Sequence, residues 1–489
     1  MEPTNTLIIC CDQHNPEITG CYGDARVHTP NLDALAARGT RFDNAYTSTP
    51  ICVPARASLA CGDYAHRHGY WDNAHPFTGD QMSWGRRLAD AGVSVTTFGK
   101  LHFKDDSEHV FPGQRIPLNA KGGVGDLMTA ARSRDPEPVP QLRKQIQAAN
   151  AGDSDYLHYD RNVAEYAARY LKEEAPNKQE PWCCYVGFVT PHYPLIAPEE
   201  IVELYKPFDR FEVPEQWYDE STLHPAIREY KRVVEMDGHV SPEELQRAIA
   251  VYYAMVTFLD QQVGVVLKAL EEAGLDKTTR VIYLDDHGDS AGAHGIFFKS
   301  NMYEGSVRIP LIAAGPGIPV GKTTSAPASI LDIYPTLLDF FGIEATQEER
   351  DLPGVSMAEA FEGRADPNRV IFSEYHCSGY RSSIYMVRKG DFKLVKYMTY
   401  DDVSLFDLAN DPDENVDLGT NPEYAGKVAE LLADLADICD VDEVTRESFA
   451  DQQKLLNSVG GIEGVIKRGL TPFSAVPKGL GLDDGKPAR

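Results

Sequence analysis

The chain has 489 residues, of which 42% are hydrophobic and 25% are charged, an ordinary composition for a large folded protein. The formal net charge of −27 argues against nucleic acid or an anionic membrane as a partner, because both bind basic surfaces. An anionic substrate would need a local positive pocket.

No targeting or anchoring segment is predicted. Residues 1–6 lack the basic start of a secretory signal, the apolar run 7–11 is too short for one, and no stretch is expected to span a membrane. The nine cysteines, with adjacent pairs at 10–11 and 183–184, resemble neither a disulfide framework nor a zinc site. We therefore expect a cytoplasmic protein.

Strands and helices alternate along the first 300 residues. Residues 7–11 form an apolar run typical of a buried strand, and residues 29–39 follow as a capped helix. Further strands are predicted at 93–98, 182–189 and 281–284. This alternation predicts an α/β fold with a mostly parallel sheet and helices on both faces.

A long helix is predicted between the last two of these strands. Ser241 and Glu244 form a capping box around Pro242. Apolar residues then recur at three- and four-residue spacing from Leu245 to Leu270. We interpret this stripe as a core face.

The C-terminal part has shorter, alternating strands. Residues 383–388 and 392–395 predict a hairpin, and a helix is expected at about 424–438. The final stretch, rich in glycine, lysine and proline, predicts an extended arm that could join subunits of a homo-oligomer. The predicted domains are a catalytic α/β domain at 1–369, a small α+β subdomain at 370–450 and the extended arm at 451–489.

The most informative segment is Cys52-Val53-Pro54-Ala55-Arg56. Proline suits the first turn of a helix, and Gly62 marks its end, so Cys52 is expected just before a helix N-terminus. Free N–H groups and the helix dipole favour an oxyanion and an ionised nucleophile there. Arg56 can lie over the same face. The alternative is a buried structural cysteine.

Polar groups follow each predicted strand of the sheet. In open α/β sheets, ligands bind beyond the carboxyl ends of the strands. Each group alone has a simpler explanation as a strand end, a turn or a solvated charge, but their common order argues for one site. The groups are Asp12-Gln13, Gly99-Lys100-Leu101-His102, Thr190-Pro191-His192, Asp285-Asp286-His287-Gly288-Asp289 and, downstream, Lys299.

Together, C-x-P-x-R at 52–56, G-K-x-H at 99–102, P-H-x-P at 191–194 and D-H-G-D at 286–289 resemble the type I, formylglycine-dependent sulfatases of the alkaline phosphatase superfamily. The resemblance covers roughly residues 5–420. It implies the alkaline-phosphatase-like α/β fold with a small C-terminal antiparallel sheet and a helix. It also implies a maturation enzyme that oxidises Cys52 to formylglycine, one divalent cation and a small-molecule sulfate ester as substrate.

The resemblance also implies roles for individual residues. An oxygen-rich ligand set with one imidazole suits Ca²⁺, with Mn²⁺ or Mg²⁺ as alternatives. The implied metal ligands are Asp12, Gln13, the modified Cys52, Asp286 and His287. The implied catalytic residues are Cys52, Arg56, Lys100, His102, His192 and Lys299. Substrate binding is assigned to Asn73, Lys100, His192 and Lys299.

In the implied chemistry, a hydroxyl of the hydrated aldehyde attacks sulfur in line. The metal and the lysines neutralise the sulfate oxygens, and His192 or Lys299 protonates the leaving alcohol. His102 is expected to take the proton of the second hydroxyl, which releases sulfate.

Two departures from the common arylsulfatase pattern indicate a narrower group within the family, and alternative functions stay open. Gln13 and His287 stand where many arylsulfatases carry Asp and Asn. With these two residues the chain resembles choline sulfatases and phosphonate monoester hydrolases more closely. Lys100 favours a sulfate monoester of an alkyl or aryl alcohol. The alternatives are a phosphonate or phosphate mono- or diester hydrolase, and a non-catalytic ion-binding relative in which Cys52 stays a thiol.

Overall fold

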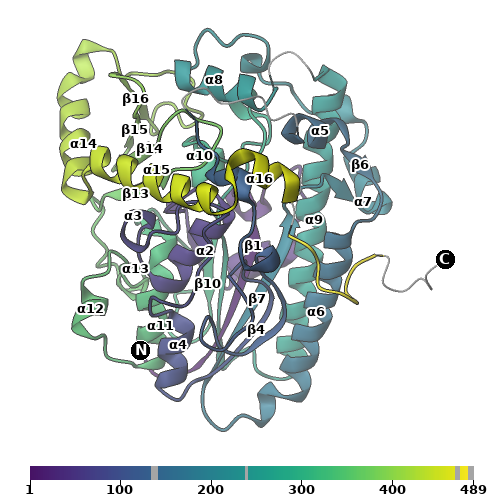
Figure 1. Cartoon of the computed structure of the whole chain (residues 1–489). Coiled ribbons are helices and arrows are strands. Elements are labelled where there is room, and N and C mark those ends of the chain that lie inside the picture. Colours follow the sequence, from purple (N-terminus) through teal and green to yellow (C-terminus); the bar gives the residue numbers. More distant parts are fainter. Residues whose placement is uncertain (134–140, 237–239, 469–473, 483–489) are drawn as a thin grey trace.

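The computed structural model describes residues 1–133, 141–236, 240–468 and 474–482. Within these residues, an eight-stranded sheet forms the centre of the protein (Figure 1). Its strands are β1 (Asn5–Asp12), β2 (Gly39–Phe42), β4 (Ser94–Lys100), β5 (Gln114–Leu118), β7 (Trp182–Pro191), β9 (Thr279–Asp285), β10 (Leu311–Ala314) and β11 (Lys322–Thr324).

The strand order is β11-β2-β10-β9-β1-β7-β4-β5. Strand β1 lies between β7 and β9 and is parallel to both, whereas β10 is antiparallel to β9 and β2. The predicted α/β class with a mostly parallel, mixed sheet is confirmed.

Helices cover both faces of the sheet. Leu7, Ile9 and Cys11 of β1 pack into one core, and Ile8 and Cys10 pack into another on the opposite face, as the two-residue period of a strand requires. The first core is covered by α1 (Pro30–Ala37), α6 (Asp155–Glu173) and α9 (Pro242–Glu272), and the second by α2 (Cys52–Cys61), α4 (Trp84–Asp90) and α11 (Ile333–Phe341).

Helix α9 begins at the predicted capping box, in which Ser241 accepts a hydrogen bond from the Glu244 backbone N–H. By length and composition this helix could cross a membrane, although no membrane-spanning stretch was expected from the sequence. Its apolar window of 18 residues has a mean hydropathy of 1.3. However, 83% of its apolar window is buried. It packs against α6, α1 and β7, so it is the predicted core helix.

A glycine allows β4 to approach β7 closely before it enters the site. Gly99 has a φ of +88°, and a Cβ at this position would lie 2.0 Å from the carbonyl oxygen of Gly187. The next residue, Lys100, ends β4 at the same edge of the sheet as Asp12 of β1 and Asp285 of β9. This edge carries the site described below.

The C-terminal part forms a four-stranded antiparallel sheet, as predicted. Its strands are β13 (Ile371–Tyr375), β14 (Ile384–Lys389), β15 (Phe392–Tyr397) and β16 (Val403–Asp407), and α14 (Ala425–Ile438) packs on it.

The extended arm predicted from residue 451 is wrong for its first part. Two helices, α15 (Val441–Ser458) and α16 (Gly461–Arg468), occupy this region, and the boundary expected at 450 falls inside α15. Asp440 caps α15 through its side chain, and Leu456 and Val465 are buried. Residues 474–482 do follow an extended path with a turn.

Shorter elements connect these layers. They are β3 (Ala45–Tyr46), which pairs with β12 (Ala328–Ser329), β6 (Asn150–Ala151), which pairs with β8 (Ile196–Ala197), and the short helices α3 (Ala65–His68), α5 (Gln141–Gln147), α7 (Glu199–Val202), α8 (Pro225–Val233), α10 (Glu304–Val307), α12 (Gln347–Arg350) and α13 (Ala358–Phe361).

Candidate active site

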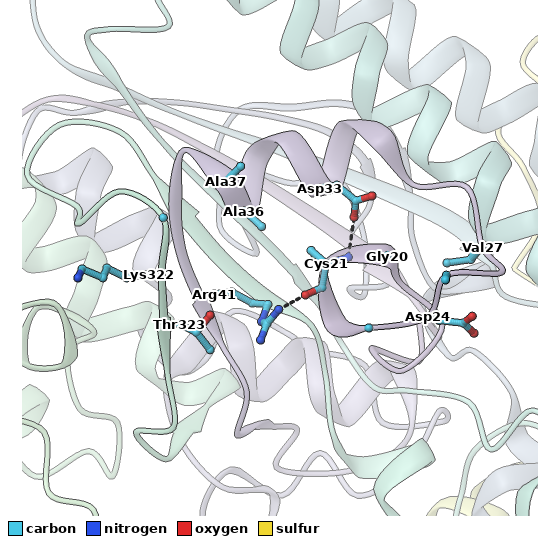
Figure 2. A pocket seen from close by; sticks show the side chains of 13 residues that line it. Gly20, Cys21, Asp24, Val27, Asp33, Ala36, Ala37, Arg41, Lys322 and Thr323 are labelled. Atoms are coloured by element: carbon cyan, nitrogen blue, oxygen red, sulfur yellow. Dashed lines mark hydrogen bonds between the residues drawn. The ribbon is translucent and has the colours of Figure 1, made fainter.

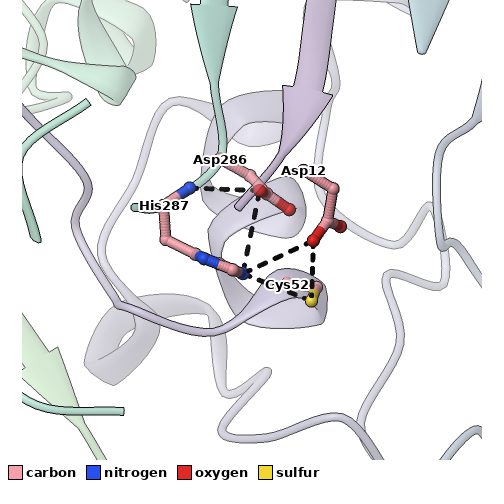
Figure 3. A group of neighbouring side chains, drawn as sticks. All are labelled: Asp12, Cys52, Asp286 and His287. Carbon is pink, nitrogen blue, oxygen red and sulfur yellow. Dashed lines mark hydrogen bonds and ion pairs between the residues drawn. The ribbon is translucent and has the colours of Figure 1, made fainter. Parts of the chain in front are cut away.

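The carboxyl ends of β1 and β9 meet the N-terminus of α2 in one buried cluster. Ligand atoms of Asp12, Cys52, Asp286 and His287 all lie within 4.8 Å of one another, and the four side chains point toward one another (Figure 3). Helix α2 begins at Cys52 itself, one residue earlier than expected, with Ile51 as its N-cap. All ten residues of this helix are buried.

The Cys52 thiol is surrounded by charged and polar groups. Its Sγ lies 3.0 Å from Lys299 Nζ, 3.3 Å from His287 Nε2 and 3.6 Å from Asp12 Oδ1. Burial, together with Asp12, raises the pKa of this thiol. An unmodified cysteine would therefore be a poor nucleophile here at neutral pH. In a formylglycine, a hydroxyl of the aldehyde hydrate would stand where the Sγ stands.

Arg56 and Lys100 neutralise the buried carboxylates. The guanidinium of Arg56 donates to Asp286 Oδ2 at 2.7 Å and to the Cys11 carbonyl oxygen at 2.8 Å. The Lys100 ammonium lies 2.5 Å from Asp12 Oδ2. Burial alone would raise the pKa of Asp12, but the cationic neighbours, Lys100 first, bring it well below its usual range. Asp12 is thus an anion in the folded protein.

His287 presents a lone pair to the cluster. Its Nδ1 lies 3.1 Å from the Gly288 carbonyl oxygen, which can only accept, so Nδ1 carries the proton and Nε2 faces Cys52 as an acceptor. Burial lowers the pKa of His287, which keeps the ring neutral. A neutral imidazole fixed through its other nitrogen is typical of a metal ligand. Together with the carboxylates of Asp12 and Asp286, it fits a divalent cation.

Gln13 follows Asp12 and carries an amide that contacts two charged groups. Its Oε1 accepts a hydrogen bond from Lys299 Nζ at 2.8 Å, and its Nε2 donates to Asp289 Oδ2 at 2.6 Å. The amide oxygen therefore faces the cluster and adds a further oxygen donor to the set.

Two histidines stand beside the cluster. His192 stacks on Tyr193 with ring centroids 4.1 Å apart, and its Nδ1 lies 2.6 Å from the Tyr193 carbonyl oxygen. His102 has a φ of +62°, and its Nε2 lies 2.5 Å from the Ser474 hydroxyl. Burial lowers the pKa of both rings well below the usual value, with Lys299 adding to the effect on His192 and Lys100 to that on His102.

Asn73 has a structural contact beside the nucleophile position. Its Oδ1 accepts a hydrogen bond from the Val53 backbone N–H at 3.1 Å, so it satisfies one of the free donors at the start of α2. Helix α15 holds the loop that carries it, through Trp71 Nε1 to Asp451 at 3.0 Å and Gln452 Nε2 to Asp72 at 2.9 Å. The structure thus places every predicted site residue at or beside one cluster.

Three residues near the site were given no individual role from the sequence. Asp160 of α6 accepts hydrogen bonds from the backbone N–H groups of Val189 and Thr190, just before His192. Asp289 supports Gln13, and it carried a signal as the last letter of the D-H-G-D motif. Ser474 carried no motif that would have indicated its contact with His102.

A separate hollow lies elsewhere on the surface and shares no residue with the site. It has a volume of about 610 Å³. Around it, Cys21 donates its backbone N–H to Asp33, and its carbonyl oxygen accepts a hydrogen bond from Arg41 (Figure 2). The backbone groups of Cys21 and the side chains of Asp33 and Arg41 are thus hydrogen-bonded to one another.

Comparison with known proteins identifies the family. The profile of the sulfatase family matches residues 4–343, well over half of the chain. The chain belongs to the sulfatase family. A second profile, the C-terminal region of N-sulphoglucosamine sulphohydrolase, matches residues 292–440. The sulfatase assignment, and with it a sulfuric ester hydrolase class of enzyme, confirms the prediction from the sequence motifs.

Individual relatives match most of this sulfatase-family protein. It is 32% identical to a choline-sulfatase of Rhizobium meliloti (strain 1021), over 88% of this chain and 85% of the relative. Arylsulfatase K of Homo sapiens is 30% identical, over 84% and 78% of the two chains.

Among solved structures, the phosphonate monoester hydrolase of Agrobacterium radiobacter has a TM-score of 0.69 at 22% identity, over 89% of this chain and 95% of that one. A 2-O GAG sulfatase has the same TM-score at 23% identity, over 98% and 99%. These structures share the fold.

Proposed function

We propose that this sulfatase-family enzyme hydrolyses a sulfate monoester of an alkyl or aryl alcohol through a formylglycine at position 52 and one divalent cation, with calcium as the expected metal. The observation that carries the proposal is the position of Cys52. It starts a buried helix, beside Lys299 and the groups that fit a cation. An anion at this point faces the helix dipole and buried positive charges.

The cation would be held by Asp12, Gln13, Asp286, His287 and the modified residue 52. When present, the hydrated formylglycine supplies the nucleophile and the cation supplies Lewis acidity. Lys100 and Lys299 bring fixed positive charge to sulfate oxygens, which lowers the barrier to attack on an anionic ester. Arg56 holds the carboxylate of Asp286 and the end of β1 in place.

The two histidines are assigned the proton transfers. Nδ1 of His192 donates a hydrogen bond to the Tyr193 carbonyl oxygen, so Nε2 can protonate the leaving-group oxygen only in the imidazolium form, in which both ring nitrogens carry a proton. Lys299, a cation in the folded protein, is the alternative proton donor. The buried Nδ1 of His102 has no hydrogen-bond partner among the described residues, whereas its Nε2 is engaged by Ser474. We assign Nδ1 of His102 as the atom that accepts a proton from residue 52.

Phosphonate or phosphate esters are the second candidate class, supported by the shared fold with phosphonate monoester hydrolases. Lys100 places additional positive charge at the site and supports sulfate. Steady-state rates on matched nitrophenyl sulfate and phosphonate esters test the choice. Faster turnover of the phosphonate ester would contradict the assignment of a sulfate monoester as substrate. A panel of choline sulfate, aryl sulfates and sugar sulfates would then define the alcohol.

The modification itself needs a direct test, because an unmodified Cys52 would make the protein a non-catalytic ion-binding relative. Mass spectrometry of the peptide that carries residue 52 should show the aldehyde, formed by a maturation enzyme. A fully reduced thiol in an active preparation would contradict the proposed chemistry.

We further propose a cytoplasmic location and a homo-oligomer. None of the nine cysteines, all within the described residues, forms a disulfide, which supports a reducing compartment. Phe449 of α15 and Ile466 of α16 are large exposed apolar side chains that a partner subunit could cover. Cell fractionation and light scattering test these two points.

A further inference from the structure

Asp289 is a fully buried carboxylate directly behind the candidate metal cluster. It follows β9 by four residues and has no solvent exposure. Its Oδ2 accepts a hydrogen bond from Gln13 Nε2 at 2.6 Å, and its Oδ1 accepts from the backbone N–H groups of Ala291 at 2.7 Å and Phe298 at 2.9 Å. Three donors therefore converge on this carboxylate.

The backbone of Gln13 is fixed independently of its side chain. Its N–H donates to Asp285 Oδ1 at 2.8 Å, and its carbonyl oxygen accepts from the Tyr252 hydroxyl at 2.6 Å. Its φ is +75°, an uncommon conformation that these contacts hold in place. With the backbone fixed, the remaining freedom of the residue is the orientation of its amide.

An amide has a donor end and an acceptor end, whereas a carboxylate accepts only. The hydrogen bond to Asp289 therefore commits Nε2 of Gln13 to the side away from the cluster. Its Oε1 must then face the cluster, where it accepts from Lys299 Nζ at 2.8 Å. The orientation of one amide follows from the charge of the group behind it.

We infer that Asp289 is a positioning residue that orients the Gln13 amide so that its oxygen, and not its nitrogen, faces the cation. This inference rests on the proposed function, because it assumes a cation held by the cluster. It explains why a glutamine fits at position 13, where a carboxylate would put two acceptors in hydrogen-bond contact with no proton between them. The residue types at 13 and 289 are therefore coupled.

The same carboxylate also fixes the backbone that leads to Lys299. Its Oδ1 closes the turn from Asp289 to Phe298, the residue before Lys299, and Phe298 has a φ of +70°. A substitution that keeps these two backbone hydrogen bonds but changes the group facing Gln13 isolates the amide orientation from this second role.

Asp289→Asn is that substitution. Its side-chain oxygen can keep the two backbone N–H groups, while its Nδ2 now faces Gln13. The Gln13 amide must then turn, which puts its nitrogen toward Lys299 and the cation site. We expect the dissociation constant for Ca²⁺ to rise about 10–100-fold, the range typical of a lost supporting contact.

Gln13→Glu tests the pair from the other side. In the presence of Asp289 it places two carboxylates in contact, and Ca²⁺ binding should weaken. In the double variant Q13E/D289N, the introduced asparagine can donate to one oxygen of the introduced glutamate, and the other oxygen faces the cation. We expect the double variant to recover most of the affinity that D289N alone loses.

The experiment is a calorimetric titration of Ca²⁺, and separately of Mn²⁺, into chelator-treated full-length protein whose formylglycine content has been measured by mass spectrometry. Asp260→Asn is the matched control. Asp260 is another buried carboxylate that accepts from a side-chain amide and from a backbone N–H, those of Asn31 and Leu32, and it lies on α9 outside the cluster. This control substitution should leave Ca²⁺ affinity unchanged.

The outcomes separate the two proposals. A wild-type protein that binds neither cation would overturn the proposed metal site itself. Normal binding by wild type and by D289N would overturn only the inference about Asp289, as would a double variant that binds no better than D289N. If D289N does not fold, Q13E compared with Q13E/D289N tests the same coupling, and equal affinities of those two would overturn it.

Discussion

The ammonium of Lys299 lies 3.0 Å from the Sγ of Cys52 at the start of α2. Burial would lower the pKa of Lys299, but the neighbouring Cys52 and Asp12 raise it above its ordinary value. Lys299 therefore remains a cation although it is buried. A fixed positive charge beside residue 52 stabilises any anion that forms or binds there.

Cys52→Ala should abolish turnover of nitrophenyl sulfate while changing the free energy of unfolding by only about 1 kcal/mol, a typical effect of a single truncation. Steady-state rates and thermal unfolding check the two parts. Cys61→Ala, a truncation at the buried C-terminal end of the same helix, is the matched control and should retain activity. Residual turnover by Cys52→Ala above that of a blank would contradict the nucleophile assignment.

Arg56→Met should destabilise the protein by about 3–5 kcal/mol, because it leaves buried Asp12 and Asp286 without their shared cation. Urea unfolding measures this loss. Arg446→Met is the control, since Arg446 forms an exposed ion pair with Glu443 and its loss should cost no more than about 1 kcal/mol. Equal losses in the two variants would show that Arg56 is not a structural part of the cluster.

Much of the fold was predictable because local signals are strong in buried elements. The apolar run of β1 and the Ser241 capping box of α9 indicate their elements without tertiary information. The order of the strands was not predictable, because an apolar run does not specify its neighbour. The antiparallel β10 has four buried residues and no feature that separates it from the parallel strands.

The assembly of the cluster was predictable for a topological reason. Asp12 and Asp286 come at or just after the carboxyl ends of neighbouring parallel strands, which must share one edge of the sheet. Ser474 was not predictable, since 372 residues separate it from His102 and only the tertiary path of the chain brings them together. The start of α15 could have been predicted, because Asp440 followed by Asp442 and Glu443 is the pattern of an N-cap and an acidic first turn.

His68 predicts a loss of stability in acid. Burial lowers the pKa of His68 to about 3, against about 6.5 in an unfolded chain. Its Nδ1 accepts from the Tyr70 backbone N–H at 3.1 Å, which requires a neutral ring. Between these two pKa values the unfolded chain binds more protons. The stabilisation is therefore fully present above pH of about 6.5 and falls by up to about 1.4 kcal/mol per pH unit on acidification.

The measurement is the free energy of unfolding in urea at several pH values from about 7.5 down to about 3, because the loss of stability spans the range between these two pKa values. His68→Gln keeps an acceptor but cannot titrate, so its dependence on pH should be shallower. His109→Gln, on an exposed loop, should match wild type. A His68→Gln variant as sensitive to acid as wild type would contradict the assignment.

Ser474 predicts a catalytic role for the C-terminal segment. Its hydroxyl lies 2.5 Å from His102 Nε2, and its carbonyl oxygen accepts from the Tyr156 hydroxyl at 2.9 Å. If Ser474 Oγ accepts a hydrogen bond from Nε2–H of His102, the ring carries its lone pair on Nδ1. The proposed proton transfer from residue 52 needs the lone pair at that atom. General-base catalysis contributes about 10²–10⁴-fold, so a misoriented base should cost roughly tenfold or more in kcat.

Ser474→Ala should therefore lower kcat with little change in thermal stability, and Ser474→Thr, which keeps the hydroxyl, should restore it. Removal of all residues after 468 should lower activity at least as far as Ser474→Ala, because the segment also packs Val476 and Leu480 against the core beside α6. Comparison of kcat and KM distinguishes loss of proton transfer from loss of substrate binding. A change confined to KM would mean that Ser474 shapes the substrate pocket without orienting His102.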